Sequence, residues 1–204
     1  MFIVDDDASM RKSVSRLLLA NGIANESFPS ARDYLGRASY DGIGCILLDV
    51  NMPDISGIEL QTRLVDQGGD IPIIFLTGYG NISMSVEAMK QGALDFLTKP
   101  VSEEVLLPAV LGALEHHGSL KNASDIRESI EARLATLTRR EEEVMQELIT
   151  GAPNKIIADR LGIATKTVKV HRANLLHKMD VRSIAELLHL CHLVGTEPDS
   201  STHR

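Results

Sequence analysis

The chain has 204 residues, of which 44% are hydrophobic and 24% charged, and its formal net charge is −7. That length suits one large domain or two smaller ones, with enough apolar content for at least one core. The only two cysteines are far apart in the sequence, and the first residues, MFIVDDD, do not resemble a secretory signal. No apolar run approaches the roughly 20 residues that a membrane helix needs. These features predict a cytoplasmic protein without membrane contact.

Two periodicities alternate through the first 118 residues. Apolar runs predict strands at 2–4, 43–48, 71–77 and 94–98, and the less apolar segment 24–28 is a further strand candidate. Apolar residues at helical spacing predict helices from Met10 to Asn21, after Ser30, after Gly57, at 82–91 and at 102–115. Strict alternation of strand and helix predicts an α/β fold, in which a doubly wound five-stranded parallel sheet binds ligands at the carboxyl ends of its strands.

The pattern changes at 116–124, HHGSLKNAS, which predicts a domain boundary. Apolar residues between 126 and 137 recur every three or four positions, so the connector is predicted to be helical. A capping box at Thr138 and Glu141 predicts the start of a helix that ends near Thr150. Further helices are predicted at 154–161, 165–179 and 184–193. The predicted domains are therefore 1–118 and 137–204, joined by a linker over 119–136.

The charge differs between the two parts. Residues 1–118 contain 8 basic and 16 acidic residues, whereas residues 119–204 contain 13 and 12. The segment 154–182 contains seven basic residues and only two acidic residues. This asymmetry predicts different partners for the two parts, although two solvated faces would produce the same composition.

Polar residues end the predicted strands. Asp5 and Asp6 follow the first strand, Asp49 ends the strong strand CILLD, Thr77 ends the next strong strand, and Lys99 follows the last. In a parallel sheet these ends share one edge, where crowded carboxylates favour a divalent cation such as Mg²⁺. An aspartate nucleophile with a lysine and a hydroxyl for incoming oxygens predicts phosphoryl transfer. Each residue alone is ordinary turn chemistry, and the prediction depends on their conjunction.

The motifs IVDDD (3–7), LLDVNMPDISG (47–57), FLTGYG (75–80) and GALDFLTKP (92–100) resemble the receiver domain of two-component response regulators. The resemblance covers essentially all of 1–118. It implies a flavodoxin-like fold and a sensor histidine kinase that phosphorylates Asp49. The chain begins almost on its first strand, where members of this family usually carry several more residues.

The same resemblance assigns roles by position. Asp6, Asp49 and the backbone carbonyl of Asn51 would hold Mg²⁺, with Asp5 assisting through a water molecule. Thr77 and Lys99 would contact the phosphoryl group. Phe96 stands where the family often has an aromatic residue that turns inward on activation, and a phenylalanine there would act by packing alone.

The predicted helix from Thr165 has two different faces. Val168, Leu175 and Met179 form an apolar face, whereas the opposite stripe is basic and small; its members are Lys166, Lys169, Val170, Ala173 and His177. With the short helix before it and Gly162 between them, the spacing suits a helix-turn-helix. Amphipathicity alone would also suit a helical bundle with a solvated face.

Residues 137–187 resemble the LuxR-type helix-turn-helix, so the second domain is expected to be an all-α four-helix unit that binds double-stranded DNA. A receiver with this output module resembles the FixJ/NarL class, and HRAN (171–174) resembles its FixJ-like branch. By position, Lys169, Val170, Ala173 and Asn174 would face the major groove. The candidates for phosphate contacts are Lys155, Thr165, Lys166, Thr167, Arg172 and Lys178. Ala164 stands where a capping serine is common, and Thr165 is expected to substitute.

The resemblance implies a transcriptional activator. Phosphorylation would release an inhibitory contact between the domains and let the face formed by 82–91, 94–98 and 102–115 form a homodimer, which then reads a two-fold DNA site and engages RNA polymerase. One alternative is a phosphohydrolase of the haloacid-dehalogenase type. Asn51 argues against it, because that enzyme class has an acid/base aspartate there. A second alternative is a phosphate sink whose tail binds protein, which the basic stripe disfavours.

Overall fold

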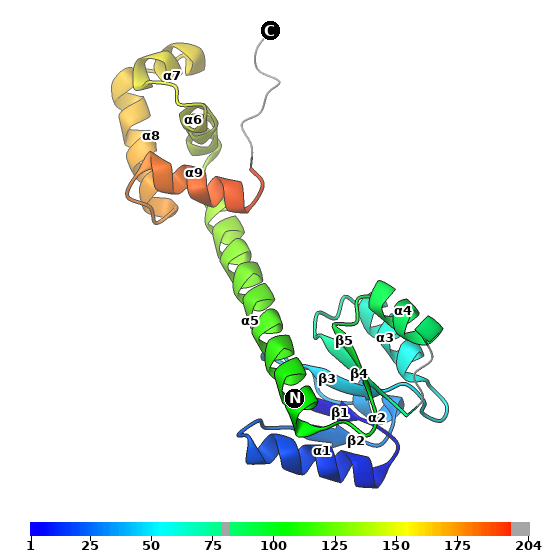
Figure 1. The fold of residues 1–204 in the computed structure, drawn as a ribbon. Coiled ribbons are helices and arrows are strands. Elements are labelled where there is room, and N and C mark those ends of the chain that lie inside the picture. Colours follow the sequence, from blue (N-terminus) through cyan, green and yellow to red (C-terminus); the bar gives the residue numbers. More distant parts are fainter. Residues whose placement is uncertain (79–81, 197–204) are drawn as a thin grey trace. The chain divides into compact units, whose positions relative to one another are not determined.

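The computed structural model describes residues 1–78 and 82–196, with side chains given outside 79–85 and 197–204. The chain divides into two compact units, Met1–Lys121 and Asn122–Arg204 (Figure 1). No helix among the described residues is both long enough and apolar enough to cross a membrane.

Unit 1 contains a five-stranded parallel sheet in the order β2-β1-β3-β4-β5. The strands are β1 Phe2–Val4, β2 Glu26–Phe28, β3 Ile46–Asp49, β4 Ile73–Thr77 and β5 Asp95–Thr98. Because β1 lies between β2 and β3, the strand order reverses there, and the crevice at the carboxyl ends of β1 and β3 is the switch point of a doubly wound sheet. The predicted flavodoxin-like arrangement is confirmed.

Helices cover both faces of this sheet (Figure 1). One face packs against α1 Ala8–Ala20 and α5 Glu103–Leu134, with Ile3, Leu47 and Val110 among the buried side chains. The other packs against α2 Ala31–Leu35, α3 Gly57–Asp66 and α4 Ile82–Lys90, with Val4 and Leu60 in its core. Successive strand residues face opposite layers, so each strand is apolar on both faces, as buried parallel strands usually are.

The ends of several elements differ from prediction. Ser30 caps α2, as predicted, through a bond from Asp33 N to its hydroxyl. However, β3 begins at Ile46 instead of 43, and Ile43 is 52% exposed. The reason is tertiary, because the Gly44 amide donates to the buried His117 side chain at 2.9 Å.

The predicted interruption at 116–124 is absent from the structure, since α5 is continuous from Glu103 to Leu134. A glycine inside a helix costs only about 1 kcal/mol, so Gly118 does not end it. Two contacts hold this stretch on unit 1: His117 bonds to Gly44, and Lys121 pairs with Asp41 at 2.5 Å. The expectation that the helix of unit 1 stops at residue 115 is therefore wrong.

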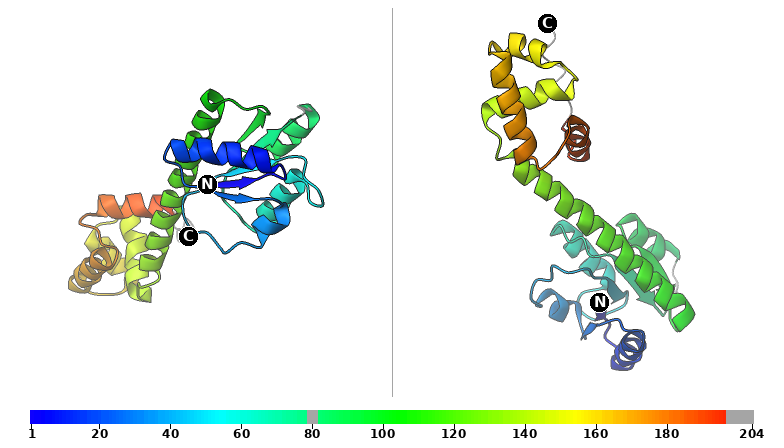
Figure 2. Two further views of the ribbon diagram at one scale, coloured as in Figure 1. Left: turned by 90° about the horizontal axis from the view of Figure 1, so that it is seen from below. Right: turned by 90° about the vertical axis from the view of Figure 1, so that its left-hand side faces the viewer.

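Unit 2 is helical throughout its described part. It contains α6 Arg139–Ile149, α7 Asn154–Leu161, α8 Thr165–Lys178 and α9 Ile184–Leu193. Val144, Ile157, Val168, Leu175 and Leu187 are fully buried in its core. Figure 2 shows α7 and α8 meeting at a tight turn.

The local sequence signals of unit 2 are mostly confirmed. Thr138 and Glu141 form the predicted capping box at the start of α6. Gly162 ends α7 with φ +65°, in the left-handed region that favours glycine. Ala164 is the N-cap of α8 and no side chain caps this end, so the expectation that Thr165 substitutes is wrong.

Candidate functional site

The carboxyl ends of β1, β3, β4 and β5 bring the predicted polar residues of unit 1 together. Val4 pairs with Leu48 and Thr77 pairs with Thr98, so the residues that follow β1 and β5 lie beside the ends of β3 and β4. Carboxylate oxygens of Asp5, Asp6 and Asp49 all lie within 4.8 Å of one another. Asp5 is fully buried and Asp49 is 5% exposed, whereas Asp6 stands in solvent at the rim.

Lys99 reaches into this acidic cluster. Its Nζ lies 2.6 Å from Asp5 Oδ2 and 3.2 Å from Asp49 Oδ1, with 19% of the side chain exposed. Burial raises the pKa of Asp49 and Asp5 adds to that effect, while the charge of Lys99 opposes it. Burial lowers the pKa of Lys99, but its bonds to Asp5 and Asp49 outweigh burial and the net pKa is raised. One ammonium thus faces three carboxylates.

Gly57 sets the shape of the crevice behind Asp49. A Cβ at this position would lie 2.2 Å from the Asp49 carbonyl oxygen, so only glycine fits. The Gly57 amide donates to the Val50 carbonyl at 2.9 Å, which fastens the start of α3 to the end of β3. The glycine of the MPDISG motif therefore serves close backbone packing.

The other predicted residues of this site also lie at the same edge. Thr77 is 1% exposed, and its carbonyl accepts from the Lys99 amide at 2.7 Å. Asn51 is exposed, and its backbone amide donates to the Asp49 carboxylate. Phe96 is half-buried, with its ring centroid 6.0 Å from that of Phe75. The Lys99–Pro100 peptide is cis.

The donor set fits a hard divalent cation. All three carboxylates are oxygen donors, and a single nearby ammonium leaves their charge largely uncompensated. Mg²⁺ binds through one or two carboxylates and keeps open positions for phosphate oxygens. The residues of this acidic cluster are therefore suited to Mg²⁺.

In unit 2, α8 has the two faces that its sequence predicts. Val168, Leu175 and Met179 are fully buried. The opposite stripe is exposed and consists of Lys166, Lys169, Val170, Ala173 and His177. Asn174, Thr165, Thr167 and Lys155 are also exposed, whereas Arg172 is half-buried and donates to Asn154 Oδ1 at 3.4 Å.

Lys178 does not join this exposed stripe. Its Nζ lies 2.7 Å from Glu141 Oε2 and 2.9 Å from the Thr136 carbonyl. The same Glu141 oxygen accepts from the Thr138 amide at 2.8 Å. Lys178 therefore connects the end of α8 to the capped start of α6, and its ammonium is used inside unit 2.

Sequence patterns missed two residues of importance. His117 is 1% exposed; its Nδ1 lies 2.9 Å from the Gly44 amide nitrogen and 3.0 Å from the Gly44 carbonyl oxygen, and its Nε2 lies 3.5 Å from Asp70 Oδ2. Glu141 was expected only as a capping residue, yet it is 3% exposed and binds Lys178. Gly44 is distant in sequence from His117, and Lys178 is distant from Glu141, so periodicity contains no signal for either contact.

Comparison with protein families matches both units. Residues 1–111 match the response regulator receiver domain, and residues 135–191 match the luxR family of bacterial regulatory proteins.

Similar proteins match almost the whole chain. It is 41% identical to the transcriptional regulatory protein FixJ of Rhizobium meliloti over 96% of both chains. It is 40% identical to nodulation protein W of Bradyrhizobium diazoefficiens, over 96% of this chain and 86% of that protein. A solved structure of the response regulator StyR has a TM-score of 0.88 and 43% identity, and covers 94% of this chain and 96% of that one.

Proposed function

We propose that this chain, which belongs to the response regulators that join a receiver domain to a LuxR-type DNA-binding domain, is switched by phosphorylation of Asp49. The observation that carries the proposal is the position of Asp49 at the end of β3, beside Lys99 and two further carboxylates. We assign 1–118 as the phosphoacceptor domain, 119–136 as the linker and 137–204 as the DNA-binding domain.

In the proposed reaction, a carboxylate oxygen of Asp49 attacks the phosphorus of a phosphohistidine on the partner kinase. The new O–P bond forms as the P–N bond breaks, and the histidine nitrogen leaves with the electron pair. Lys99, 3.2 Å from Asp49, neutralises charge on the phosphoryl oxygens, and the Thr77 hydroxyl donates a hydrogen bond to one of them. Phe96 then repacks toward the core.

Asp5, Asp6, Asp49 and the carbonyl of Asn51 are the proposed Mg²⁺ ligands. When bound, the ion supplies positive charge that offsets the repulsion between these carboxylates and the incoming phosphoryl group. Asn51 has no ionisable group at the position where an acid/base catalyst would be needed, so we propose that the chain does not turn over a separate substrate.

The exposed face of α8 is the proposed DNA-reading surface. Lys169, Val170, Ala173 and Asn174 would approach base edges. Phosphate contacts are proposed for Lys155, Thr165, Lys166, Thr167 and Arg172. Because the Lys178 ammonium is bonded to Glu141, we propose that Lys178 positions α8 instead of contacting phosphate.

We further propose that phosphorylation produces a homodimer through the face formed by α4, β5 and α5, and that two DNA-binding domains then read a two-fold site. The chain would act in the cytoplasm as an activator that engages RNA polymerase. The family match to a DNA-binding output domain supports this role.

The decisive experiment compares the full-length wild type with Asp49→Asn, in Mg²⁺ and acetyl phosphate. Phosphate incorporation, mass in solution and affinity for operator DNA are measured on the same samples. Wild type is expected to gain phosphate, to dimerise and to bind DNA at least tenfold more tightly, because the switch adds charge at Asp49. Asp49→Asn, which keeps the size of the side chain, is expected to change in none of these measurements. Equal responses from both proteins would refute the assignment of Asp49.

A further inference from the structure

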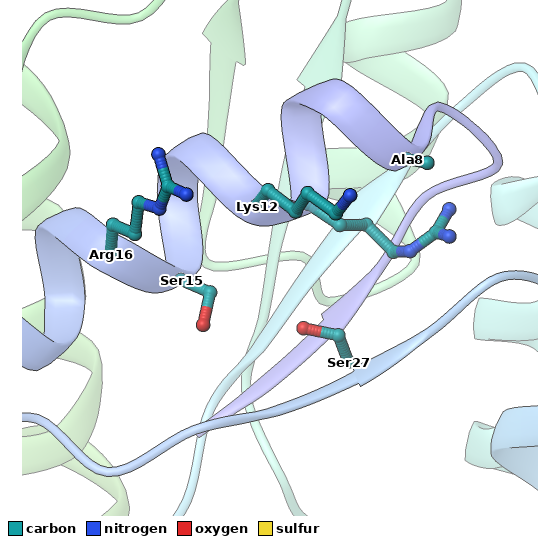
Figure 3. A pocket seen from close by; sticks show the side chains of 6 residues that line it. Ala8, Lys12, Ser15, Arg16 and Ser27 are labelled. Atoms are coloured by element: carbon teal, nitrogen blue, oxygen red, sulfur yellow. The ribbon is translucent and has the colours of Figure 1, made fainter.

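A groove on unit 1 lies between α1 and β2, separate from the acidic cluster. It has a volume of about 320 Å³ and is lined by Ala8, Arg11, Lys12, Ser15, Arg16 and Ser27. Figure 3 shows Ser15 on α1 and Ser27 on β2 beside the same gap, with Lys12 and Arg16 on the helix. None of the carboxylates proposed to hold Mg²⁺ lines it.

The lining is cationic, although unit 1 as a whole is acidic. Among the described residues, no carboxylate forms an ion pair with Arg11, Lys12 or Arg16. Four other cations of this unit have carboxylate partners (Arg32, Arg63, Lys99 and Lys121), whereas Arg37 and Lys90 form no ion pair among the described residues. The groove therefore concentrates positive charge that the fold itself does not neutralise.

This arrangement works against the stability of α1. Lys12 and Arg16 are four residues apart on the helix, and like charges at this spacing repel. A bound anion would offset this repulsion.

The groove also offers oriented donors. Arg11 is half-buried, and its Nη1 donates to the Asp5 carbonyl at 2.6 Å, which fixes the guanidinium and leaves further N–H groups for a ligand. Asn25 Nδ2 donates to the Ser15 carbonyl at 3.2 Å and holds α1 against the start of β2. The hydroxyls of Ser15 and Ser27 have no partner among the described residues.

We propose that this groove binds a small anion that carries two or more phosphate groups, such as a diphosphate or a nucleoside diphosphate. Two guanidinium groups recognise phosphate oxygens in paired hydrogen bonds, while an ammonium and two hydroxyls supply point contacts. Its volume lies at the lower limit for small-molecule sites, which suits a compact ligand.

The test is a titration of the ¹⁵N-labelled full chain with inorganic pyrophosphate, followed by amide chemical shifts. The buffer is free of Mg²⁺, and potassium chloride maintains the ionic strength. Saturable shifts are expected at residues 8–16 and 27. The double variant Lys12→Ala/Arg16→Ala is expected to bind at least tenfold more weakly. The matched control is Lys90→Ala, an exposed lysine outside the groove, and it is expected to bind like wild type.

Three results would overturn the proposal. Shifts that merely follow ionic strength would show screening without a site. Equal affinity in wild type and the double variant would place the ligand elsewhere. Binding of an acidic protein to this face, with no response to pyrophosphate, would assign the groove to macromolecular docking. The Asp49→Asn variant should bind pyrophosphate normally, so this test is independent of the phosphorylation switch.

Discussion

Among the described acidic residues of unit 2, Glu141 has the most strongly shifted pKa. Its bond with Lys178 is the main reason that its pKa falls to about 2 from an ordinary value of 4.5, and the Thr138 amide adds to this effect. A carboxylate with a lowered pKa stabilises the fold above its unfolded pKa, and that stability is lost as the pH falls through the folded pKa. The relevant window therefore runs from pH 4.5 down to about 2.

We expect Glu141→Gln to lower the free energy of unfolding of unit 2 by about 1–3 kcal/mol at pH 7, because the half-buried Lys178 ammonium loses its buried charged acceptor. The difference from wild type should shrink as the pH falls from 4.5 to about 2, because the unfolded chain takes up a proton at this carboxylate over that range and the folded chain does so only near pH 2. Urea unfolding of the full chain at several pH values measures both effects.

Glu142→Gln is the matched control, since Glu142 is the exposed neighbour of Glu141. It should change stability by less than about 0.5 kcal/mol. A Glu141→Gln effect that does not depend on pH would contradict the role assigned to its charge.

Gly57→Ala tests the close packing behind Asp49. The added Cβ would lie 2.2 Å from the Asp49 carbonyl oxygen, so backbone must move. We expect a loss of about 1–3 kcal/mol in unfolding free energy. The matched control is Gly112→Ala, because nothing lies within 4 Å of its added Cβ. Equal stability of Gly57→Ala and wild type would show that the crevice is not constrained there.

Among the elements, α8 begins without a side-chain cap. Ala164 has the extended backbone of an N-cap but no side-chain acceptor for the first turn. Ala164→Ser should place a hydroxyl near the Thr167 amide and stabilise unit 2 by about 1 kcal/mol. Ala173→Ser, in the exposed middle of the same helix, should stabilise nothing, since serine is a poorer helix former than alanine. A higher urea midpoint for Ala164→Ser alone would confirm the cap; similar midpoints for both variants would contradict it.

Local sequence signals predict the elements and the acidic cluster well, because both depend on neighbouring residues. Strand ends are marked by a change from apolar to polar residues, as at Leu48–Asp49, and parallel topology then brings those ends to one edge. The capping box at Thr138 and the glycine at 162 are likewise local signals, and the structure contains both.

The misplaced boundaries have tertiary causes. The sequence 116–124 is polar and contains glycine, yet α5 continues through it. His117 in this stretch forms a hydrogen bond with Gly44, 73 residues away. The family resemblance makes Lys178 a candidate for a phosphate contact, and periodicity contains no signal for its bond to Glu141, 37 residues earlier. No periodicity records such pairings.

At the scale of the whole molecule, DNA affinity should depend steeply on salt. Each phosphate neutralised contributes about −0.9 to the slope of log K against log salt concentration. We expect Lys166→Ala to reduce the magnitude of that slope by about 0.9 per protomer. Lys178→Ala should leave the slope unchanged and lower stability instead, because its ammonium binds Glu141. Titrations of phosphorylated protein with operator DNA at several salt concentrations measure this, and a reduced slope for Lys178→Ala would contradict its positioning role.

The contact between His117 and Gly44 connects α5 to the start of β3. Gly44 lies just before β3, the strand that ends in Asp49, and His117 lies on α5, the helix that leads out of unit 1. The His117 contact and Asp49 thus lie at opposite ends of one short strand. Together with the apolar packing of Val110, this contact ties α5 to the strand that ends in Asp49.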